Sequence, residues 1–278
     1  VGYHAGFYAT GGSNVFVGEA AGRGVDGSST AANNTAVGRN ALYAYTTGDT
    51  NCAFGKDSLI ACTTGTNNVA VGQGSGKAIN TGATNICIGD IAGDNITDGN
   101  ENIIIGYQSR TGSSGHDRTI CLGYQVTGAE NSFTFGEGSS DSRVASGATT
   151  ITAPSDERYK EDITTATAGL SFIKDLRPVT FKWKKEKDIP NTQNAYVEGS
   201  DKRVMNDNIN HGFIAQEVKT AINAHSEIKD GFEMWSEDPT DGRQRLGDAA
   251  LMPMMVKAVQ ELSTALDAAL ARIATLEG

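Results

Sequence analysis

Short apolar runs that each end in glycine recur through the first half of the chain. Successive closing glycines are separated by 20, 17, 17, 17, 17, 17 and 13 residues, and they are Gly18, Gly38, Gly55, Gly72, Gly89, Gly106, Gly123 and Gly136. Apolar residues stand one and three positions before most of them, as in Val69/Val71 and Ile103/Ile105. A period of two predicts a short strand in each repeat, with these residues on its inward face.

Asparagine stands four residues before the glycine in six of these runs, at Asn14, Asn34, Asn51, Asn68, Asn85 and Asn102. An amide that recurs once per turn either forms a ladder with its copies or caps the local turn. One unit of 17 residues buries little by itself, so the units must stack. We therefore predict an all-β solenoid or β-roll over residues 1–140. Its thin core indicates that several chains share it, and we favour a trimer.

The second half of the chain has a different composition. Residues 1–154 hold 7 Lys+Arg and 12 Asp+Glu, whereas residues 155–278 hold 16 and 21. We predict a linker over 141–154 and an α+β domain over 155–250. Its expected elements are a short helix at 168–176, a strand at 179–183 and a strand leading into a helix at 212–222, with an irregular segment up to residue 248.

The last segment, residues 251–278, carries a heptad pattern. Apolar residues step alternately by three and four positions along Met252, Met255, Val259, Leu262, Leu266, Ala269, Ile273 and Leu276. Pro253 suits the first turn of a helix. The spacing is typical of a coiled coil, which we expect to be trimeric, although one amphipathic helix packed on its own domain gives the same pattern.

Charge and motif content exclude several classes of function. The net charge is −10, so a basic footprint for nucleic acid is absent, and no apolar run approaches the roughly 20 residues that span a bilayer. The four cysteines lack metal-ligand spacing and are expected to be apolar filler. The glycine-rich segment at 72–78 lacks the full phosphate-loop spacing. The acidic series Asp90, Asp94, Asp98 and Glu101 does not match a calcium loop, so solvated turns are expected. We predict no cofactor and no metal.

Three motifs, in this order along the chain, resemble those of a known family. They are SDERYKEDI from Ser155, HGFIAQEV from His211, and the helical segment from Leu251 onward. Together they resemble the C-terminal intramolecular chaperone domain of phage endosialidases, tail fibres and tail spikes. The upstream repeats resemble units of phage fibres and of trimeric adhesin heads. The resemblance implies a domain that trimerises, aligns the β-structured fibre, and then removes itself by cleavage between Pro154 and Ser155.

The residues at this junction are chemically suited to such a cut. A serine hydroxyl becomes a nucleophile when a base takes its proton, and a lysine amine becomes a base when burial lowers its pKa from about 10.4 towards neutrality. Ser155 is the candidate nucleophile and Lys160 the candidate base. Asp156 is either catalytic or the cap of a turn or helix. His211 is a candidate for assisting or orienting the Ser155–Lys160 pair. The activity would be a single-turnover autoproteolysis, without turnover of an external substrate.

The leading hypothesis is the distal part of a viral tail fibre, assembled in the host cytoplasm and carried on the virion. Its partners would be its own copies and a host cell-surface receptor, with a glycan as one candidate. A bacterial trimeric adhesin is an alternative, but such proteins need an outer-membrane anchor at the C-terminus. A polysaccharide-degrading tail spike is another, and it would need paired carboxylates that nothing in the repeats singles out.

Overall fold

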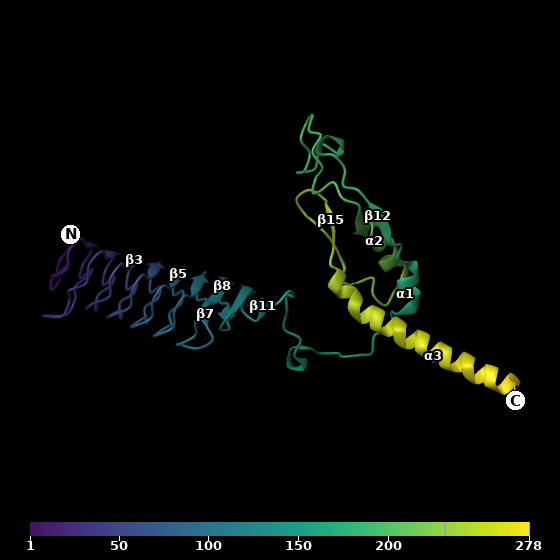
Figure 1. Ribbon diagram of the computed structural model, residues 1–278, viewed down its shortest axis with the longest axis horizontal. Helices are drawn as coiled ribbons and strands as arrows, with labels where there is room; N and C mark the ends of the chain where they lie inside the picture. The colour runs from purple at the N-terminus through teal and green to yellow at the C-terminus, as the bar shows by residue number, and fades with distance from the viewer. Residues whose placement is uncertain (231, 278) are drawn as a thin grey trace. The chain divides into compact units, whose positions relative to one another are not determined.

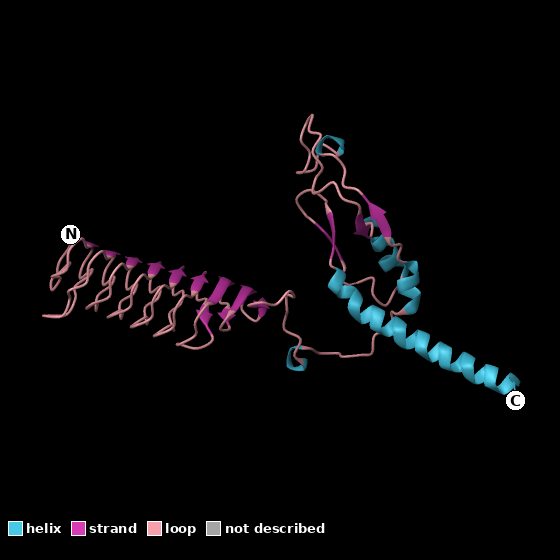
Figure 2. Ribbon diagram, viewed as in Figure 1, coloured by secondary structure: helices cyan, strands magenta, loops and turns pink. Residues whose placement is uncertain are grey.

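The computed structural model describes residues 1–230 and 232–277, which form two compact units, Val1–Glu161 and Asp162–Gly278. The first unit consists mainly of strands and turns, with one short 3-10 helix near its end, and the second of helices with short hairpins (Figures 1 and 2). The predicted fold class is thereby confirmed: an N-terminal β-solenoid is followed by an α+β unit that ends in a long helix.

The N-terminal unit is built around a nine-stranded sheet in which one strand is added per repeat. Neighbouring strands are parallel and in register, so that Val69 pairs with Ile86 and Val71 with Ile88. The parallel strands are β1 Val15–Val17, β2 Thr35–Val37, β3 Cys52–Phe54, β4 Val69–Val71, β5 Ile86–Ile88, β6 Ile103–Ile105, β8 Thr119–Tyr124 and β10 Ser132–Glu137. The last strand, β11 Ser140–Ala145, turns back antiparallel to β10. A second small sheet pairs β7 Arg110–Thr111 with β9 Thr127–Gly128.

The inward face of each strand is the opposite of the one we expected from the alternation. The middle residue is the buried one, as at Ala36, Ala53, Ala70, Cys87 and Ile104. The flanking apolar residues point outward and are half-buried or exposed. Most middle residues are small, because the turn encloses little space behind the strand and larger side chains from the loops, such as Leu59, Ile79 and Ile96, fill the rest. The prediction was therefore wrong about which residues of each strand face inward, and an apolar row runs along the outside of the sheet.

The recurring asparagines form a continuous buried ladder. The backbone N–H of each one donates to the side-chain oxygen of the asparagine one repeat earlier: Asn68 to Asn51 at 3.0 Å and Asn85 to Asn68 at 3.0 Å. Each side-chain nitrogen also donates to a turn carbonyl, as from Asn68 to Gly82 at 2.8 Å. The asparagine side chain thus has both predicted roles, because it forms a ladder with its copies and also caps a turn.

The closing glycines meet a double constraint. Gly72 has φ +129°, and a Cβ atom there would lie 2.4 Å from the carbonyl oxygen of Gly89 in the next repeat. Gly55 is placed in the same way against Gly72, again at 2.4 Å. Only glycine satisfies both the backbone angle and this close approach of successive turns.

The C-terminal unit packs two short helices and the start of a long one around a small core. The helices are α1 Leu170–Asp175, α2 Ala215–Ala224 and α3 Leu251–Glu277. Phe172, Val218, Ile222 and Met234 are almost fully buried between them. Two hairpins complete the unit, β12 Val179–Phe181 with β13 Asn210–Gly212 and β14 Trp235–Glu237 with β15 Gln244–Leu246. The second hairpin lies in the segment expected to be irregular, so that expectation was wrong.

Helix α3 presents two different faces. Leu251, Met254 and Ala258 are buried within the unit, and the Glu261 carboxylate accepts the backbone N–H of Leu170 at 2.8 Å, where Gly169 provides no side chain to cap α1. The residues of the predicted seam are all exposed: Met255, Val259, Leu262, Leu266, Ala269, Ile273 and Leu276. Gly278, the last residue of the predicted coiled coil, lies outside the described residues. The described helices include none that is long and apolar enough to cross a membrane.

The asparagine ladder yields a direct stability prediction. Asn68→Ala removes the acceptor of the Asn85 N–H and the donor to Gly82, and both of those groups are buried. Each buried polar group left without a partner costs about 1–3 kcal/mol, so we expect the free energy of unfolding of the solenoid to fall by at least about 2 kcal/mol. Urea unfolding followed by circular dichroism measures it. The exposed Thr64→Ala is the matched control, and equal midpoints for the two variants would contradict a structural role for the ladder.

Candidate functional site

The Ser155–Lys160 segment forms a single tight turn after the last strand of the solenoid. Its centre is a one-turn 3-10 helix, η1 Glu157–Tyr159. The backbone is extended on both sides, at Asp156 and at Lys160. Two backbone hydrogen bonds close the turn, from Tyr159 N–H to Asp156 at 3.1 Å and from Lys160 N–H to Glu157 at 2.9 Å. A five-residue gap does not place two side chains on one face of an α-helix, but this turn brings the ends of the segment together.

The structure brings the two principal candidate residues into contact. The Nζ atom of Lys160 donates a hydrogen bond to Oγ of Ser155 at 2.8 Å. This is the distance at which a nucleophile and its base exchange a proton. Both side chains are exposed in the single chain, so water and neighbouring chains have access to them. Pro154, on the other side of the expected cleavage bond, is exposed as well.

Asp156 serves as the cap of the turn. Its side chain accepts the backbone N–H of Arg158 at 2.9 Å and pairs with the guanidinium, whose Nη2 lies 2.6 Å from Oδ2. The hydrogen bonds from Arg158 lower the pKa of the Asp156 carboxyl. Its contribution to the turn is therefore present at neutral pH and is lost as the pH falls through this lowered pKa. All the hydrogen bonds described for this carboxylate go to Arg158, as expected for a cap.

His211 belongs to the C-terminal unit. It is the middle residue of β13, where it pairs across the hairpin with Thr180 of β12, and its side chain is exposed. The candidate residues therefore divide into a group on one turn, formed by Ser155, Asp156 and Lys160, and one exposed histidine on a hairpin of the other unit.

Three features of the junction were missed in the sequence. Arg158 pairs with Asp156, and Thr152 forms an isolated β-bridge with Arg143 of β11. A cavity of about 530 Å³ also opens beside Pro154 and is lined from the solenoid side by Thr127 and Gly138, among others. The β-branched run TTIT, at residues 149–152, was the available signal for the bridge, because such runs favour extended backbone.

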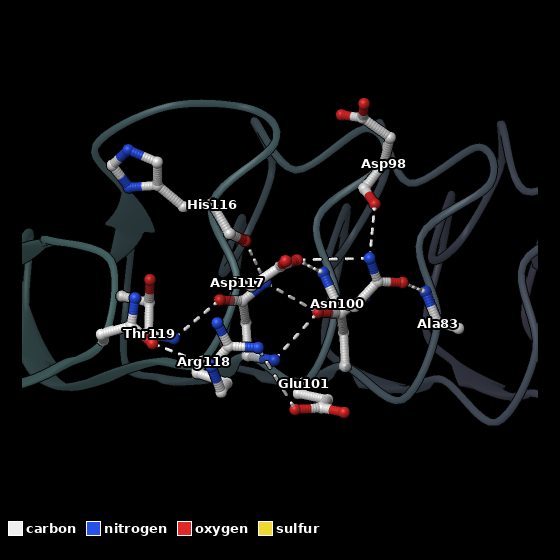
Figure 3. A network of polar contacts seen from close by, with 11 residues as sticks. Ala83, Asp98, Asn100, Glu101, His116, Asp117, Arg118 and Thr119 are labelled. Carbon is white, nitrogen blue, oxygen red and sulfur yellow. Dashed lines mark hydrogen bonds and ion pairs between the residues drawn. The ribbon is translucent and has the colours of Figure 1, made fainter. Parts of the chain in front are cut away.

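Some acidic residues of the solenoid turns serve as structural partners. Asp117 accepts the backbone N–H of Asn100 at 2.7 Å, and the Asn100 side chain accepts the N–H of Ala83 at 2.9 Å, so a second ladder runs along the turns (Figure 3). Asp94 pairs with Lys77 at 3.3 Å. Within residues 1–230 and 232–277, no group of three or more His, Cys, Asp or Glu side chains is arranged to hold a metal ion.

The buried cysteines have the environment of apolar filler. Within the described residues all four are free thiols, and burial raises the pKa of Cys87 and of Cys62 to about 12. Since the thiolate is the reactive form, these thiols are poor nucleophiles at neutral pH.

Comparison with known proteins gives one match. The family described as the chaperone of endosialidase matches residues 155–226. No curated protein and no solved structure matches the chain. The match begins at Ser155, the residue that Lys160 contacts, and extends past the end of α2. The match covers the first two of the three motifs and confirms the expected C-terminal chaperone domain there.

The role of Asp156 as the cap of the turn is testable by substitution. Asp156→Asn keeps an oxygen that accepts the Arg158 N–H, whereas Asp156→Ala removes the cap. We expect amide hydrogen exchange at Tyr159 and Lys160 to rise roughly fivefold in the alanine variant and to change little in the asparagine variant. The exposed Glu157→Ala is the control. If asparagine loosens the turn as much as alanine does, the cap is not what holds it.

Proposed function

Because residues 155–226 belong to the chaperone-of-endosialidase family, we propose that this chain is the distal part of a phage tail fibre that carries its own assembly domain. The C-terminal unit would bring three chains together and align their solenoids, and would then be released by cleavage between Pro154 and Ser155. The observation that carries this proposal is the 2.8 Å contact between Lys160 and Ser155, at the first residue of the family match.

Two uncovered apolar surfaces support assembly of the chain with its own copies. One is the outer row of the solenoid sheet, where Phe54 is 53% exposed and Leu122 48% exposed. The other is the seam of α3, where Leu266 is 60% exposed. Rows of this length on a single chain mark surfaces that associate. Both follow periodic patterns along their element, so identical chains aligned side by side would cover both surfaces, which supports a homo-oligomer; we propose a trimer.

The proposed cleavage uses the Ser155 hydroxyl against the preceding carbonyl. Oγ attacks the carbonyl carbon of Pro154 while the neutral Lys160 amine takes the hydroxyl proton. The bond from that carbon to the Ser155 nitrogen breaks, the nitrogen is protonated and becomes the new N-terminus, and the acyl group remains on Oγ as an ester. Water then hydrolyses the ester, which leaves a carboxylate on Pro154 and restores the hydroxyl. Each step uses only solvent and residues of the junction.

Assembly would couple to cleavage through the environment of Lys160. The amine must be neutral to accept a proton, and burial disfavours the charged form of an amine. In the single chain Lys160 is exposed, so such burial has to come from neighbouring chains. An unassembled chain would then keep its chaperone, and an assembled one would release it.

The remaining solenoid would attach the virion to the host surface, with a cell-surface glycan as one candidate receptor. The alternative of a polysaccharide-degrading spike needs two carboxylates at a fixed separation. Asp94 and Asp117 are instead engaged by Lys77 and Asn100 in the turns, which favours binding over hydrolysis. A bacterial adhesin would share the solenoid, but the family match to residues 155–226 favours a phage protein.

Substitutions at the junction test the cleavage. Wild-type protein should yield a new N-terminus at Ser155 and a released piece of 124 residues, from 155 to 278. Ser155→Ala removes the nucleophile and Lys160→Ala the base, and Lys160→Arg should also fail because a guanidinium stays protonated. We expect each to slow cleavage by at least about 10³-fold while the assembled form persists. Denaturing gels and N-terminal sequencing measure this, and continued cleavage of Ser155→Ala would exclude the mechanism.

Substitutions on α3 test the assembly. Leu262→Asp with Leu266→Asp places charges in the seam, and an uncompensated buried charge costs roughly 3–5 kcal/mol. We expect the double variant to sediment as a monomer and to remain uncleaved, where wild type sediments as a trimer. Thr264→Asp with Ala271→Asp adds the same charge on the opposite side of the heptad and should assemble normally. A trimeric, cleaved Leu262/Leu266 variant would show that α3 does not direct assembly.

A further inference from the structure

The segment before the proposed cleavage bond is attached to the solenoid by an isolated β-bridge. Thr152 and Arg143 exchange two backbone hydrogen bonds, each of 2.8 Å, so that residue 152 pairs with the free edge of β11. The hydroxyl of Thr152 also donates to the Arg143 carbonyl at 3.1 Å. The chain therefore does not leave the solenoid at the end of β11, but pairs with it once more, two residues before Pro154.

Arg143 is itself held by the interior of the solenoid. It pairs with Thr134 of β10 in the hairpin, and its Nε donates to the Thr134 hydroxyl oxygen at 3.2 Å. Thr134 is fully buried and lies in register with Cys121 of the preceding turn. A row of paired residues, Cys121, Thr134, Arg143 and Thr152, thus links the buried core of the last turns to the junction.

The cavity beside Pro154 gives a second indication that the junction lies on the end of the solenoid. It is lined by Thr127 and Gly138 of the solenoid and by Pro154 and Tyr159 of the junction. A smaller cavity, of about 200 Å³, is lined by Asp141 and Arg143 together with residues 152–154. Pro154 therefore lines the same two cavities as residues of the last hairpin of the solenoid.

We propose that the Arg143–Thr152 bridge is a positioning element for self-cleavage, which presents the Pro154 carbonyl to Ser155 only when the last hairpin of the solenoid has formed. This inference rests on the proposed function. Two extended residues span about 7 Å, so a bridge at Thr152 fixes the carbonyl two residues away within a narrow range. The cleavage rate depends steeply on the placement of the reacting groups, since a misplacement of about 1 Å can lower a reaction rate about 10²-fold.

The proposal gives the cleavage a folding requirement of its own. Assembly through α3 alone would leave the bond unpositioned, because β11 has to pair with β10 before its outer edge is available to Thr152. The release of the chaperone would then follow completion of the last hairpin of the solenoid. Arg143 and Thr152 act here through the backbone, as positioning residues, and they do not contact the Ser155 hydroxyl in the described structure.

The test compares prolines at neighbouring positions in the full chain. Thr152→Pro removes the N–H that donates to Arg143, whereas Ile151→Pro places the same ring at a residue whose amide donates no hydrogen bond among the described contacts. Thr152→Val removes the hydroxyl and keeps the backbone pair. We expect Thr152→Pro to slow cleavage at least tenfold, with an unchanged trimer, melting temperature and pH–rate profile, and the other two variants to cleave within about twofold of wild type.

A second variant covers the case in which Thr152→Pro impairs folding. Insertion of Gly-Ser between Ala153 and Pro154 leaves the bridge, the hairpin and the Ser155–Lys160 turn intact but lengthens the connection between them. We expect the insertion also to slow cleavage at least tenfold. Wild-type rates in the insertion variant, or in a folded Thr152→Pro, would overturn the positioning role and leave the proposed function standing. A wild-type chain that assembles and stays whole would overturn both.

Discussion

The asparagine ladder is the interaction on which the architecture of the solenoid depends. Each buried amide satisfies the backbone N–H of the next repeat and a turn carbonyl, so it replaces hydrogen bonds that water no longer provides inside the unit. The ladder works only if successive asparagines lie directly above one another. That requirement keeps successive repeats in register, whether they are 17 residues long or, as between Asn14 and Asn34, 20 residues long, and it stacks the closing glycines at the same corner.

The same constraint leaves the solenoid incomplete as a single chain. Since the ladder and the loop side chains occupy the interior, each of the three-residue strands β2 to β6 buries only its middle residue, and the flanking apolar residues lie outside. The unit therefore carries an uncovered apolar surface along its whole sheet. Helix α3 has the corresponding property, with one face used within its own unit and the heptad face free. Both units thus leave an apolar surface uncovered, which the proposed assembly with further copies would cover.

Periodicity made most of the fold predictable, and the exceptions have physical causes. The strands, the asparagine column and the extent of α3 follow from repeat spacing. The buried face of each strand did not follow from it, because alternation separates two faces without showing which one is inside. The small size of Ala53 and Ala70 at the middle position was the available signal for the buried face. The contact of Ser155 with Lys160 agrees with what the family resemblance suggested. Its cap by Asp156 and the pairing of Thr152 with Arg143 are local and unrepeated, so no period indicated them.

The strict vertical alignment of the glycine corners has a consequence for the length of the protein. Because each repeat contributes one strand to the sheet, each adds the spacing between neighbouring strands, about 4.8 Å. A duplication or deletion of 17 residues therefore changes the reach of the solenoid by one increment and leaves both ends chemically as they were. The number of repeats therefore sets the length of the solenoid, in steps of one strand spacing.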